Sequence, residues 1–429
     1  MSSTVATVAV ASPLSWAQEG VVIAVFTLVY LGMFLGGLPK LKLDRAGVAL
    51  LGAIAVIGSG VMDVDTAARA IDLPTILLLF SFMVMSAQMR LGGFYSACVR
   101  WVGAKPLSPS AFMAALIGVA APLSAVFSND VICLAMTPVV ARICLARGLH
   151  PVPYLVGLAC AANIGSAATL MGNPQNMLIG SVLQIPFTRH AQVAVGPVLL
   201  SLGVLWLWLA HGPQRHELRA AFTPAAPLTD EPGWRHDPPF DRLQTLKGGL
   251  VAGSVLACFL WTSWPHDVVA LVAAGVLLLS RRFHSSHVMG FVDWELLVMF
   301  MGLFVVNHAF ERTGLAAQAV AALAAHGVRL SDTGPLFVAA LGLSNIVGNV
   351  PAVMLLLPHI QGPGGTEAGL LLALVSTYAG NLLLVGSVAN LIVADLAAEQ
   401  GIRIDWKTHA RFAAPVAGLT LGIVAVGFL

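Results

Sequence analysis

Charged side chains are scarce in this sequence. Asp, Glu, Lys and Arg make up only 10% of its 429 residues, whereas soluble globular proteins have about 25%. Hydrophobic residues make up 58%, and the mean hydropathy is +0.87. Because a water-soluble fold cannot bury this much apolar surface, lipid is expected to be the solvent for most of the chain. The apolar runs do not alternate with polar residues as barrel strands do, so the sequence predicts an all-α polytopic membrane protein.

Several chemical signatures are also missing. The five cysteines include no Cys-x-x-Cys pair, which argues against zinc and against a disulfide framework. The apolar segments contain no His-Glu-x-x-His motif, no Gly-x-Ser-x-Gly motif and no acidic pair at helical spacing, which argues against an intramembrane enzyme. The net charge is +2 and no basic block is present, so nucleic acid is not an expected partner. Neither a metal centre nor an organic cofactor is predicted.

The sequence does contain a repeat. Two polar tripeptides interrupt apolar sequence, Ser128-Asn129-Asp130 in the first half of the chain and Gly348-Asn349-Val350 in the second. Each begins an apolar stretch in which a proline follows the asparagine after nine positions, at Pro138 and Pro358. Each tripeptide is expected to form the tip of a re-entrant hairpin, which must be shielded from lipid by protein or water.

A second pair of polar segments follows the first. Residues 172–176 read Gly-Asn-Pro-Gln-Asn, residues 386–390 read Gly-Ser-Val-Ala-Asn, and each precedes a short apolar run. The repeat also extends upstream, because 72–93 aligns with 293–314 at an offset of 221. Polar, helix-breaking segments at corresponding places in two halves are the best sequence indication of a transporter's binding site.

The organisation along the chain follows from these signals. Each half is expected to contain three spans, a hairpin, a span broken in its middle and a final span. The hairpins are placed at 108–147 and 332–360, with arms too short for a full span, and the broken spans at 152–184 and 366–399. The other expected spans are 20–38, 46–62, 74–90, 191–211, 246–264, 267–281, 291–309 and 408–428. The predicted domains are an N-terminal tail 1–19, a first inverted repeat 20–211, a cytoplasmic linker 212–247 and a second inverted repeat 248–429.

Charge distribution predicts the orientation of the chain. A hairpin re-emerges on its own side, so each half crosses the membrane five times and the second half is inverted relative to the first. Basic residues are concentrated in the Pro-rich linker 212–247, which places that linker in the cytoplasm. Both termini are then outside, with ten crossings in all. Labelling of position 225 only from the outside would contradict this orientation.

A helix broken inside the bilayer exposes backbone groups that need a partner. Helix N-termini offer partial positive charge to an anion, unwound carbonyls and hydroxyls suit Na⁺, and an asparagine amide can serve either. The expected substrate-binding residues are Asn129, Thr169, Asn173, Asn176, Gly348, Asn349 and Asn390. The expected ion-coupling residues, which would also hold Na⁺ if it is the coupling ion, are Ser128, Asn129, Asp130, Gly172, Asn349, Gly386 and Ser387.

Asp130 is the one carboxylate at a hairpin tip, and its counterpart in the repeat is Val350. A charge at that depth is costly and indicates function. It would bind a coupling cation or carry a coupling proton. His308, near the end of an expected span, is interpreted as a packing or interface histidine.

At these motifs the sequence resembles the ion transporter superfamily, in particular its arsenite-permease and Na⁺/H⁺-antiporter-like branch, which includes citrate-transporter-like proteins and anion permeases. The segments similar to the family's hairpin tips and broken helices are 127–138, 163–176, 344–351 and 380–390. The resemblance implies elevator-type alternating access and a homodimer. Related dicarboxylate symporters have two Ser-Asn-Thr tips, whereas here the tips are Ser-Asn-Asp and Gly-Asn-Val, which leaves a dicarboxylate substrate open.

Together these features predict a multi-pass secondary active transporter of the inner (plasma) membrane. It would move a small anion or oxyanion, coupled to H⁺ or Na⁺. The alternatives are an arsenite or metalloid efflux permease, a Na⁺/H⁺ antiporter and, least favoured, an intramembrane enzyme or channel. A carrier would show stimulation by solute on the opposite side, which a channel would not.

Overall fold

The computed structural model describes residues 14–37, 42–220, 239–280 and 282–429. Helices form nearly all of the regular structure in this part of the chain. The chain divides into two compact units, one made of residues 1–71 and 298–326 and the other of residues 72–297 and 327–429. The two units therefore do not coincide with the two sequence repeats, since each unit takes residues from both halves.

The smaller unit contains α1 (Trp16–Leu35), α2 (Arg45–Gly58), α3 (Val64–Ala70), most of α14 (Trp294–Glu311) and α15 (Leu315–Ala325). Glycine allows its helices to approach closely, because a Cβ atom on Gly302 would lie 2.7 Å from the carbonyl oxygen of Ala49. Small residues at such contacts are typical of helix packing in lipid. The Tyr30 hydroxyl also donates to Asn307 Oδ1 at 2.8 Å, which satisfies one buried polar group of α14.

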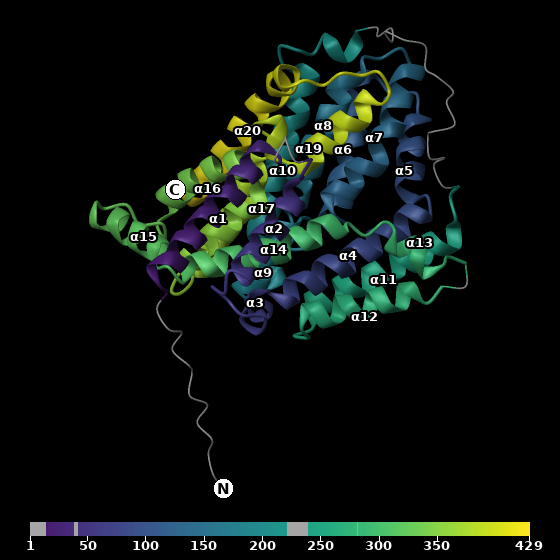
Figure 1. Ribbon diagram of the computed structural model, residues 1–429. Helices are drawn as coiled ribbons and strands as arrows, with labels where there is room; N and C mark the ends of the chain where they lie inside the picture. Colours follow the sequence, from purple (N-terminus) through teal and green to yellow (C-terminus); the bar gives the residue numbers. More distant parts are fainter. Residues whose placement is uncertain (1–13, 38–41, 221–238, 281) are drawn as a thin grey trace. The chain divides into compact units, whose positions relative to one another are not determined.

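The larger unit contains the remaining helices (Figure 1). Its first part has α4 (Leu73–Leu91), α5 (Phe94–Gly103), α6 (Pro109–Val126), α7 (Asn129–Ala146), α8 (Pro151–Ser166), α9 (Pro174–Val182), α10 (Phe187–His211) and η1 (Glu217–Arg219). Next come α11 (Arg242–Trp261), α12 (His266–Leu278) and α13 (Ser285–Met289). Its last part has α16 (Thr333–Val347), α17 (Asn349–Leu356), η2 (Leu357–His359), α18 (Gly365–Ala379), η3 (Leu384–Gly386), α19 (Val388–Ala398) and α20 (Trp406–Phe428).

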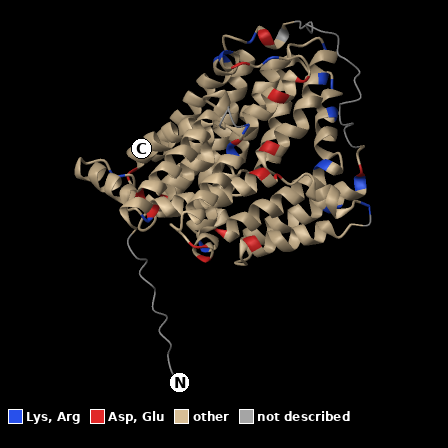
Figure 2. Cartoon of the chain, in the orientation of Figure 1, with Lys and Arg blue, Asp and Glu red and all other residues tan. Residues whose placement is uncertain are grey.

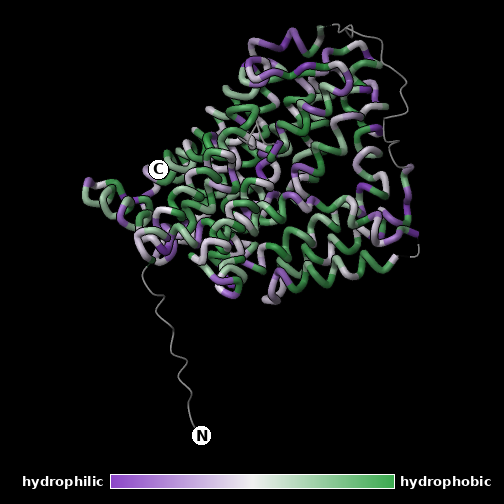
Figure 3. Tube along the Cα trace, in the orientation of Figure 1, coloured by the Kyte–Doolittle hydropathy of each residue, from purple (hydrophilic) through white to green (hydrophobic). Residues whose placement is uncertain are grey.

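Eight helices of the described residues are long and apolar enough to cross a membrane. Their hydrophobic residues run along nearly the whole helix length in Figure 3, and Figure 2 shows only a few acidic and basic residues along them. The fold is therefore that of an all-α polytopic membrane protein, as the composition predicts.

The first hairpin is longer than expected. Its arms α6 and α7 have 18 residues each and qualify as spans by length, so the expectation of two short arms is wrong for this hairpin. The helices continue through Pro122 and Pro138 instead of ending there. Proline is tolerated inside membrane helices because neighbouring helices satisfy the backbone groups that it frees. The second hairpin, α16 and α17, has arms of 15 and 8 residues.

The repeat is visible in the backbone. The predicted equivalent glycines Gly93 and Gly314 both adopt the left-handed conformation, with φ of 69° and 71°, and each precedes a short helix, α5 or α15. Sequence reasoning missed both helices because they have only 10 and 11 residues. Position 225 and most of the linker lie outside the described residues, as does most of the tail, so the orientation and the domain boundaries stay predictions.

Candidate functional site

Both predicted helix breaks are confirmed. Helix α8 ends at Ser166 and α9 begins at Pro174, while α18 ends at Ala379 and α19 begins at Val388. Between each pair of arms the chain leaves the α-helical conformation, with a single 3₁₀ turn in the second break. All sixteen residues of α8 and residues 170–176 are buried, so the first break lies inside the larger unit. In the second break Gly386 and Ser387 are buried, whereas Leu383 and Val385 are exposed.

The two breaks have the same local construction, and a constant offset of 214 in the numbering relates equivalent positions. In the first break the Asn176 amide donates to the carbonyl oxygen of Thr169 at 3.0 Å, and in the second the Asn390 amide donates to that of Leu383 at 3.2 Å. Asn173 also caps α9, because its Oδ1 accepts the Asn176 backbone N–H at 2.9 Å. Asparagine is favoured at such helix starts, which is why the helix is interrupted here.

Of the hydrogen bonds that connect one break with the other, two form a matched pair. The Ser387 hydroxyl donates to Asn163 Oδ1 at 3.1 Å, and the Asn173 amide donates to Thr377 Oγ1 at 3.3 Å. The same offset of 214 relates Asn163 to Thr377 and Asn173 to Ser387, so the two bonds are copies with the halves exchanged. Reciprocal contacts of this kind are the signature of a twofold relation. The breaks therefore face each other about a pseudo-twofold axis.

Asn163 lies where the two breaks meet, a region called the junction from here on. Sequence reasoning did not select it as a site residue. Its side chain is 1% exposed and makes four hydrogen bonds. Its Nδ2 donates to Asn381 Oδ1 at 2.8 Å and to Asn390 Oδ1 at 3.2 Å, and its Oδ1 accepts from Asn129 and Ser387. An asparagine near the end of the otherwise apolar α8 is the signal that would have indicated it.

The hairpin tips reach the breaks. The Asn129 backbone N–H donates to the Gly172 carbonyl at 3.1 Å, and its side-chain amide donates to Asn163 Oδ1 at 2.9 Å. With its amide nitrogen turned toward the second break, Asn349 donates to the Gly386 carbonyl at 3.2 Å. Gly172 and Gly386 are also related by the offset of 214, so each tip meets the equivalent glycine of the break in its own half.

The remaining predicted residues lie at the tips or beside them. Ser128 is the N-cap residue of α7, and Asp130 lies in the first turn of that helix, partly exposed. None of the ion pairs between described residues involves Asp130. Gly348 has φ of 94° and ψ of 162°, a conformation essentially restricted to glycine. The Thr169 hydroxyl donates to the Ala125 carbonyl, so it fastens the first break to α6.

Oxygen atoms suitable for a hard cation remain at the junction. The carbonyls of Thr169 and Gly172 each accept a hydrogen bond, and that of Leu383 accepts two. A carbonyl oxygen has two lone pairs, so those of Thr169 and Gly172 can still meet a cation. In addition, Asn129 Oδ1 and Asn176 Oδ1 are buried without a partner among the described residues. Side-chain oxygens of this kind are ligands that Na⁺ accepts. Asn129 and Asn176 therefore each leave one buried oxygen available to a cation or a polar solute.

Gly172 is expected to be intolerant of any side chain. A Cβ atom there would lie 2.2 Å from the Ser166 carbonyl oxygen and 2.7 Å from that of Ser124, and backbone atoms cannot move aside cheaply. Gly172→Ala should lower the free energy of unfolding by about 1–3 kcal/mol and abolish solute exchange. Thermal unfolding in detergent and exchange in proteoliposomes measure this. Gly196→Ala, where a Cβ would meet nothing within 4 Å, is the control, and equal behaviour of the two variants would contradict the prediction.

Substitution of Thr377 tests the hydrogen bonds that connect the first repeat with the second. Its hydroxyl accepts from Asn173 at 3.3 Å and from Gln175 Nε2 at 3.2 Å, and the side chain is 1% exposed. Thr377→Val keeps the shape but deprives two buried amides of this acceptor, which should reduce exchange about tenfold. Thr377→Ser keeps the hydroxyl and should exchange close to the wild-type rate. A valine variant as active as the serine variant would show that the bonds do not matter.

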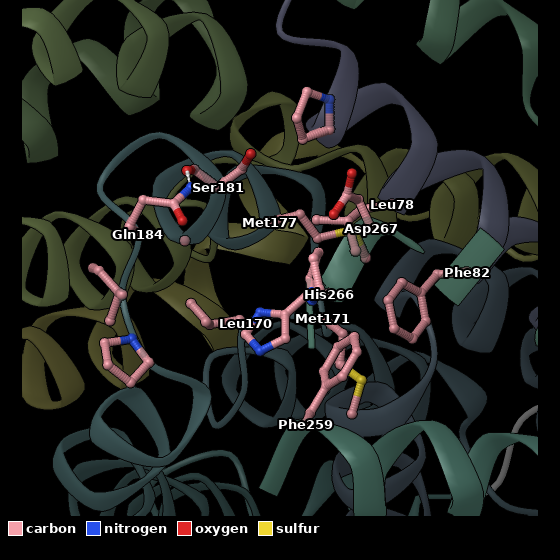
Figure 4. A pocket seen from close by; sticks show the side chains of 15 residues that line it. Leu78, Phe82, Leu170, Met171, Met177, Ser181, Gln184, Phe259, His266 and Asp267 are labelled. Atoms are coloured by element: carbon pink, nitrogen blue, oxygen red, sulfur yellow. Dashed lines mark hydrogen bonds between the residues drawn. The ribbon is translucent and has the colours of Figure 1, made fainter. Parts of the chain in front are cut away.

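A cavity of about 200 Å³ lies beside the first break (Figure 4). Leu170 and Met171 of the break form part of its wall, and Phe82, Phe259 and His266 come from α4, α11 and α12. Its polar lining consists of Ser181, Gln184, His266 and Asp267. None of the predicted site residues lines it, so it flanks the junction of the breaks without containing it.

Two broken helices facing each other inside an all-helical membrane unit, each met by a hairpin tip, define a transporter of the inverted-repeat kind. The family model described as citrate transporter matches residues 21–379. The chain belongs to the citrate transporter family.

Similar proteins include transporters from distant organisms. The chain is 29% identical to a silicon efflux transporter of rice, Oryza sativa, over 91% of this chain and 92% of that protein. It is 31% identical to the inner membrane protein YbiR of Escherichia coli, over 79% of this chain and 83% of that protein. The crystal structure of the YdaH transporter of Alcanivorax borkumensis has the same fold, with a TM-score of 0.59 at 14% identity, covering 95% of this chain and 97% of that one.

Proposed function

We propose that this transporter moves a small anion or oxyanion by secondary active transport, with the solute bound where the two breaks meet. The observation that carries the proposal is the pair of reciprocal bonds, Ser387 to Asn163 and Asn173 to Thr377. Each bond holds the N-terminus of one second arm, α19 or α9, against the first arm of the opposite half, α8 or α18. Helix N-termini present N–H groups and partial positive charge, so each of these two ends favours an anion.

The coupling ion is proposed to be H⁺ or Na⁺, acting at Asp130. This carboxylate lies one residue after Asn129, whose side chain bonds to the central Asn163. A proton on Asp130, or a sodium ion beside it and the unpartnered oxygens of Asn129 and Asn176, would remove the repulsion between the carboxylate and an anionic solute. Binding of solute and of coupling ion would then depend on each other.

A neutral, hydroxyl-rich solute is the second candidate. The groups that form hydrogen bonds at the junction are amides, hydroxyls and backbone groups, and none of those bonds involves a lysine or an arginine. Such a lining suits an uncharged oxygen acid such as arsenous or silicic acid as well as an anion. The rice relative is named a silicon efflux transporter, which favours testing this class first among the alternatives.

We further propose the inner membrane as the location, in line with the E. coli relative's name, and a homodimer that works by elevator-type alternating access. The division into two compact units supports this mechanism, because an elevator needs one body that carries the breaks and one that stays fixed. All residues of both breaks belong to the larger unit, whereas α1, α2 and most of α14 belong to the smaller one.

Counterflow in proteoliposomes tests the proposed function. Purified protein is reconstituted with one unlabelled solute inside and the same labelled solute outside, using citrate, sulfate, phosphate, arsenite and silicic acid in turn. Transient accumulation of label with one oxygen-rich solute is expected, since a carrier exchanges faster when solute is present on both sides. Exchange of none of these solutes, combined with Na⁺-driven proton movement in the same liposomes, would replace this proposal by a Na⁺/H⁺ antiporter.

A further inference from the structure

Two buried histidines lie at the breaks, and the candidate site above does not include them. His190 of α10 is 0% exposed and His409 of α20 is 1% exposed. His190 Nε2 lies 2.9 Å from the Ala167 carbonyl oxygen, and His409 Nε2 lies 3.2 Å from that of Asn381. Ala167 and Asn381 are again related by the offset of 214, as are the other pairs of equivalent positions in the breaks.

The two contacts are therefore copies of one contact, although their surroundings differ in length. The offset between the histidines themselves is 219, because α19 has 11 residues and α9 only 9, and because the connection 399–405 before α20 is longer than the connection 183–186 before α10. A longer connection would allow the last span to shift relative to its break. The same ring nitrogen nevertheless meets the equivalent carbonyl in both halves, so the contact is kept although the connection differs.

The carbonyl partner determines which ring nitrogen of each histidine carries a hydrogen atom. A carbonyl oxygen only accepts hydrogen bonds, so Nε2 must carry a hydrogen atom in both histidines. The carbonyls at the end of a helix have no partner within the helix and carry partial negative charge. Inside a membrane such a group needs a donor, and each imidazole supplies one from the last span of the same repeat.

The histidines complete a set of donors on the carbonyl side of the breaks. The carbonyls of Thr169 and Leu383 accept from asparagine side chains of α9 and α19, and that of Gly172 accepts from the tip of the first hairpin. With Ala167 and Asn381 bonded to imidazoles, the carbonyl ends are held by donors from the protein. The N-termini of α9 and α19, with their backbone N–H groups and partial positive charge, are then left to meet an oxygen atom of the solute.

We propose that His190 and His409 are a matched pair of positioning residues. Each ties the carbonyl end of one broken helix to the last span of its repeat, and so fixes where the N-terminus of α9 or α19 stands relative to the solute. This inference rests on the proposed function in one respect, namely that the solute binds at the breaks.

Substitutions separate a positioning role from simple packing. His190→Leu and His409→Leu fill similar space without a donor, whereas His190→Gln and His409→Gln place an amide N–H near the position of Nε2. We expect each leucine variant to raise the KM for exchange about tenfold with a smaller fall in kcat, and each glutamine variant to recover most of the affinity. His211→Leu removes an exposed histidine from the same helix α10 and should leave KM unchanged.

Two measurements decide the inference without any transport assay. In the wild-type protein, ¹⁵N NMR of labelled histidine should show the Nε2–H tautomer for the signals that disappear in the His190→Gln and His409→Gln variants. Hydrogen exchange of the backbone amides of 167–173 and 380–387 should accelerate in the leucine variants and much less in the glutamine variants. An Nδ1–H tautomer at either position, or amide exchange that does not change, would overturn the inference.

The outcomes also distinguish this inference from the proposed function. If the wild-type protein exchanges no solute, the proposed function is contradicted, while the tautomer and the amide exchange still decide the role of the histidines. If the wild-type protein exchanges solute and the leucine variants keep its KM, or the glutamine variants do no better than leucine, the positioning role is wrong and the proposed function stands.

Discussion

Replacement of Asn163 by leucine is expected to reduce solute exchange by at least about 100-fold. Leucine has the same branch point and the same number of side-chain heavy atoms as asparagine but no polar ones, so the change disturbs the packing of the buried α8 less than it disturbs the hydrogen bonds. A buried polar group left without a partner costs about 1–3 kcal/mol. The partners that would be left unpaired are Asn129, Asn381, Ser387 and Asn390. Counterflow in proteoliposomes at matched protein levels measures the loss.

A second buried asparagine provides the control for Asn163. Asn307 is 7% exposed in the smaller unit, and its Oδ1 accepts from the Tyr30 hydroxyl, far in sequence from either break. Asn307→Leu is expected to lower the thermal stability and to leave exchange largely intact. If Asn163→Leu is no less active than Asn307→Leu at equal stability, Asn163 only packs the helix and the junction of the breaks is not the solute site.

Replacement of Asp130 by asparagine is expected to abolish gradient-driven transport and to leave solute exchange intact. Asparagine has the shape of aspartate, so the first turn of α7 should be preserved, but it can neither bind a proton at neutral pH nor balance the charge of a cation. A carboxylate at this depth is expected to have such a role. Net uptake driven by a pH or Na⁺ gradient should fall to the level of protein-free liposomes, while counterflow, which needs no net coupling, should continue.

Comparison of net uptake with counterflow separates a role of Asp130 in coupling from a role in binding the solute. Asp130→Glu keeps the charge and should retain part of the coupled uptake, so it serves as the matched variant. Near-normal net uptake by Asp130→Asn would rule out the coupling role. Loss of both uptake and counterflow in a stably expressed Asp130→Asn protein would instead show that the carboxylate is needed to bind the solute.

The breaks could be predicted from the sequence because their cause is local. Gly, Pro and Asn at 172–176, and Gly, Ser and Asn at 386–390, disfavour a continuous helix through residue chemistry alone. Their duplication indicated a twofold arrangement before any contact was known. The helix ends observed at Ser166, Pro174, Ala379 and Val388 agree with that expectation.

Other features could not be predicted from the sequence because they depend on residues that are far away along the chain. Proline at 138 normally ends a helix, and only the surrounding helices of the larger unit allow α7 to continue to Ala146. Thr377 has no distinctive sequence context, and Asn163 differs from its surroundings only as an asparagine in apolar sequence. The importance of both lies in which partners the packing brings to them. His190 and His409 read as ordinary histidines near the starts of spans, whereas the histidine considered from the sequence, His308, lies in α14 and is not involved in any break.

By itself the sequence determined the solvent of this protein, its helical class, its two-fold repeat and the places where its helices are interrupted. Those properties follow from composition and from conformational preferences that act over a few residues. Only the tertiary structure decided which interrupted ends meet, because a side chain such as Asn163 acquires most of its partners from the opposite half of the chain. Burial supplies the reason for the pairing, since each polar group enclosed among apolar helices must find its donor or acceptor within the fold.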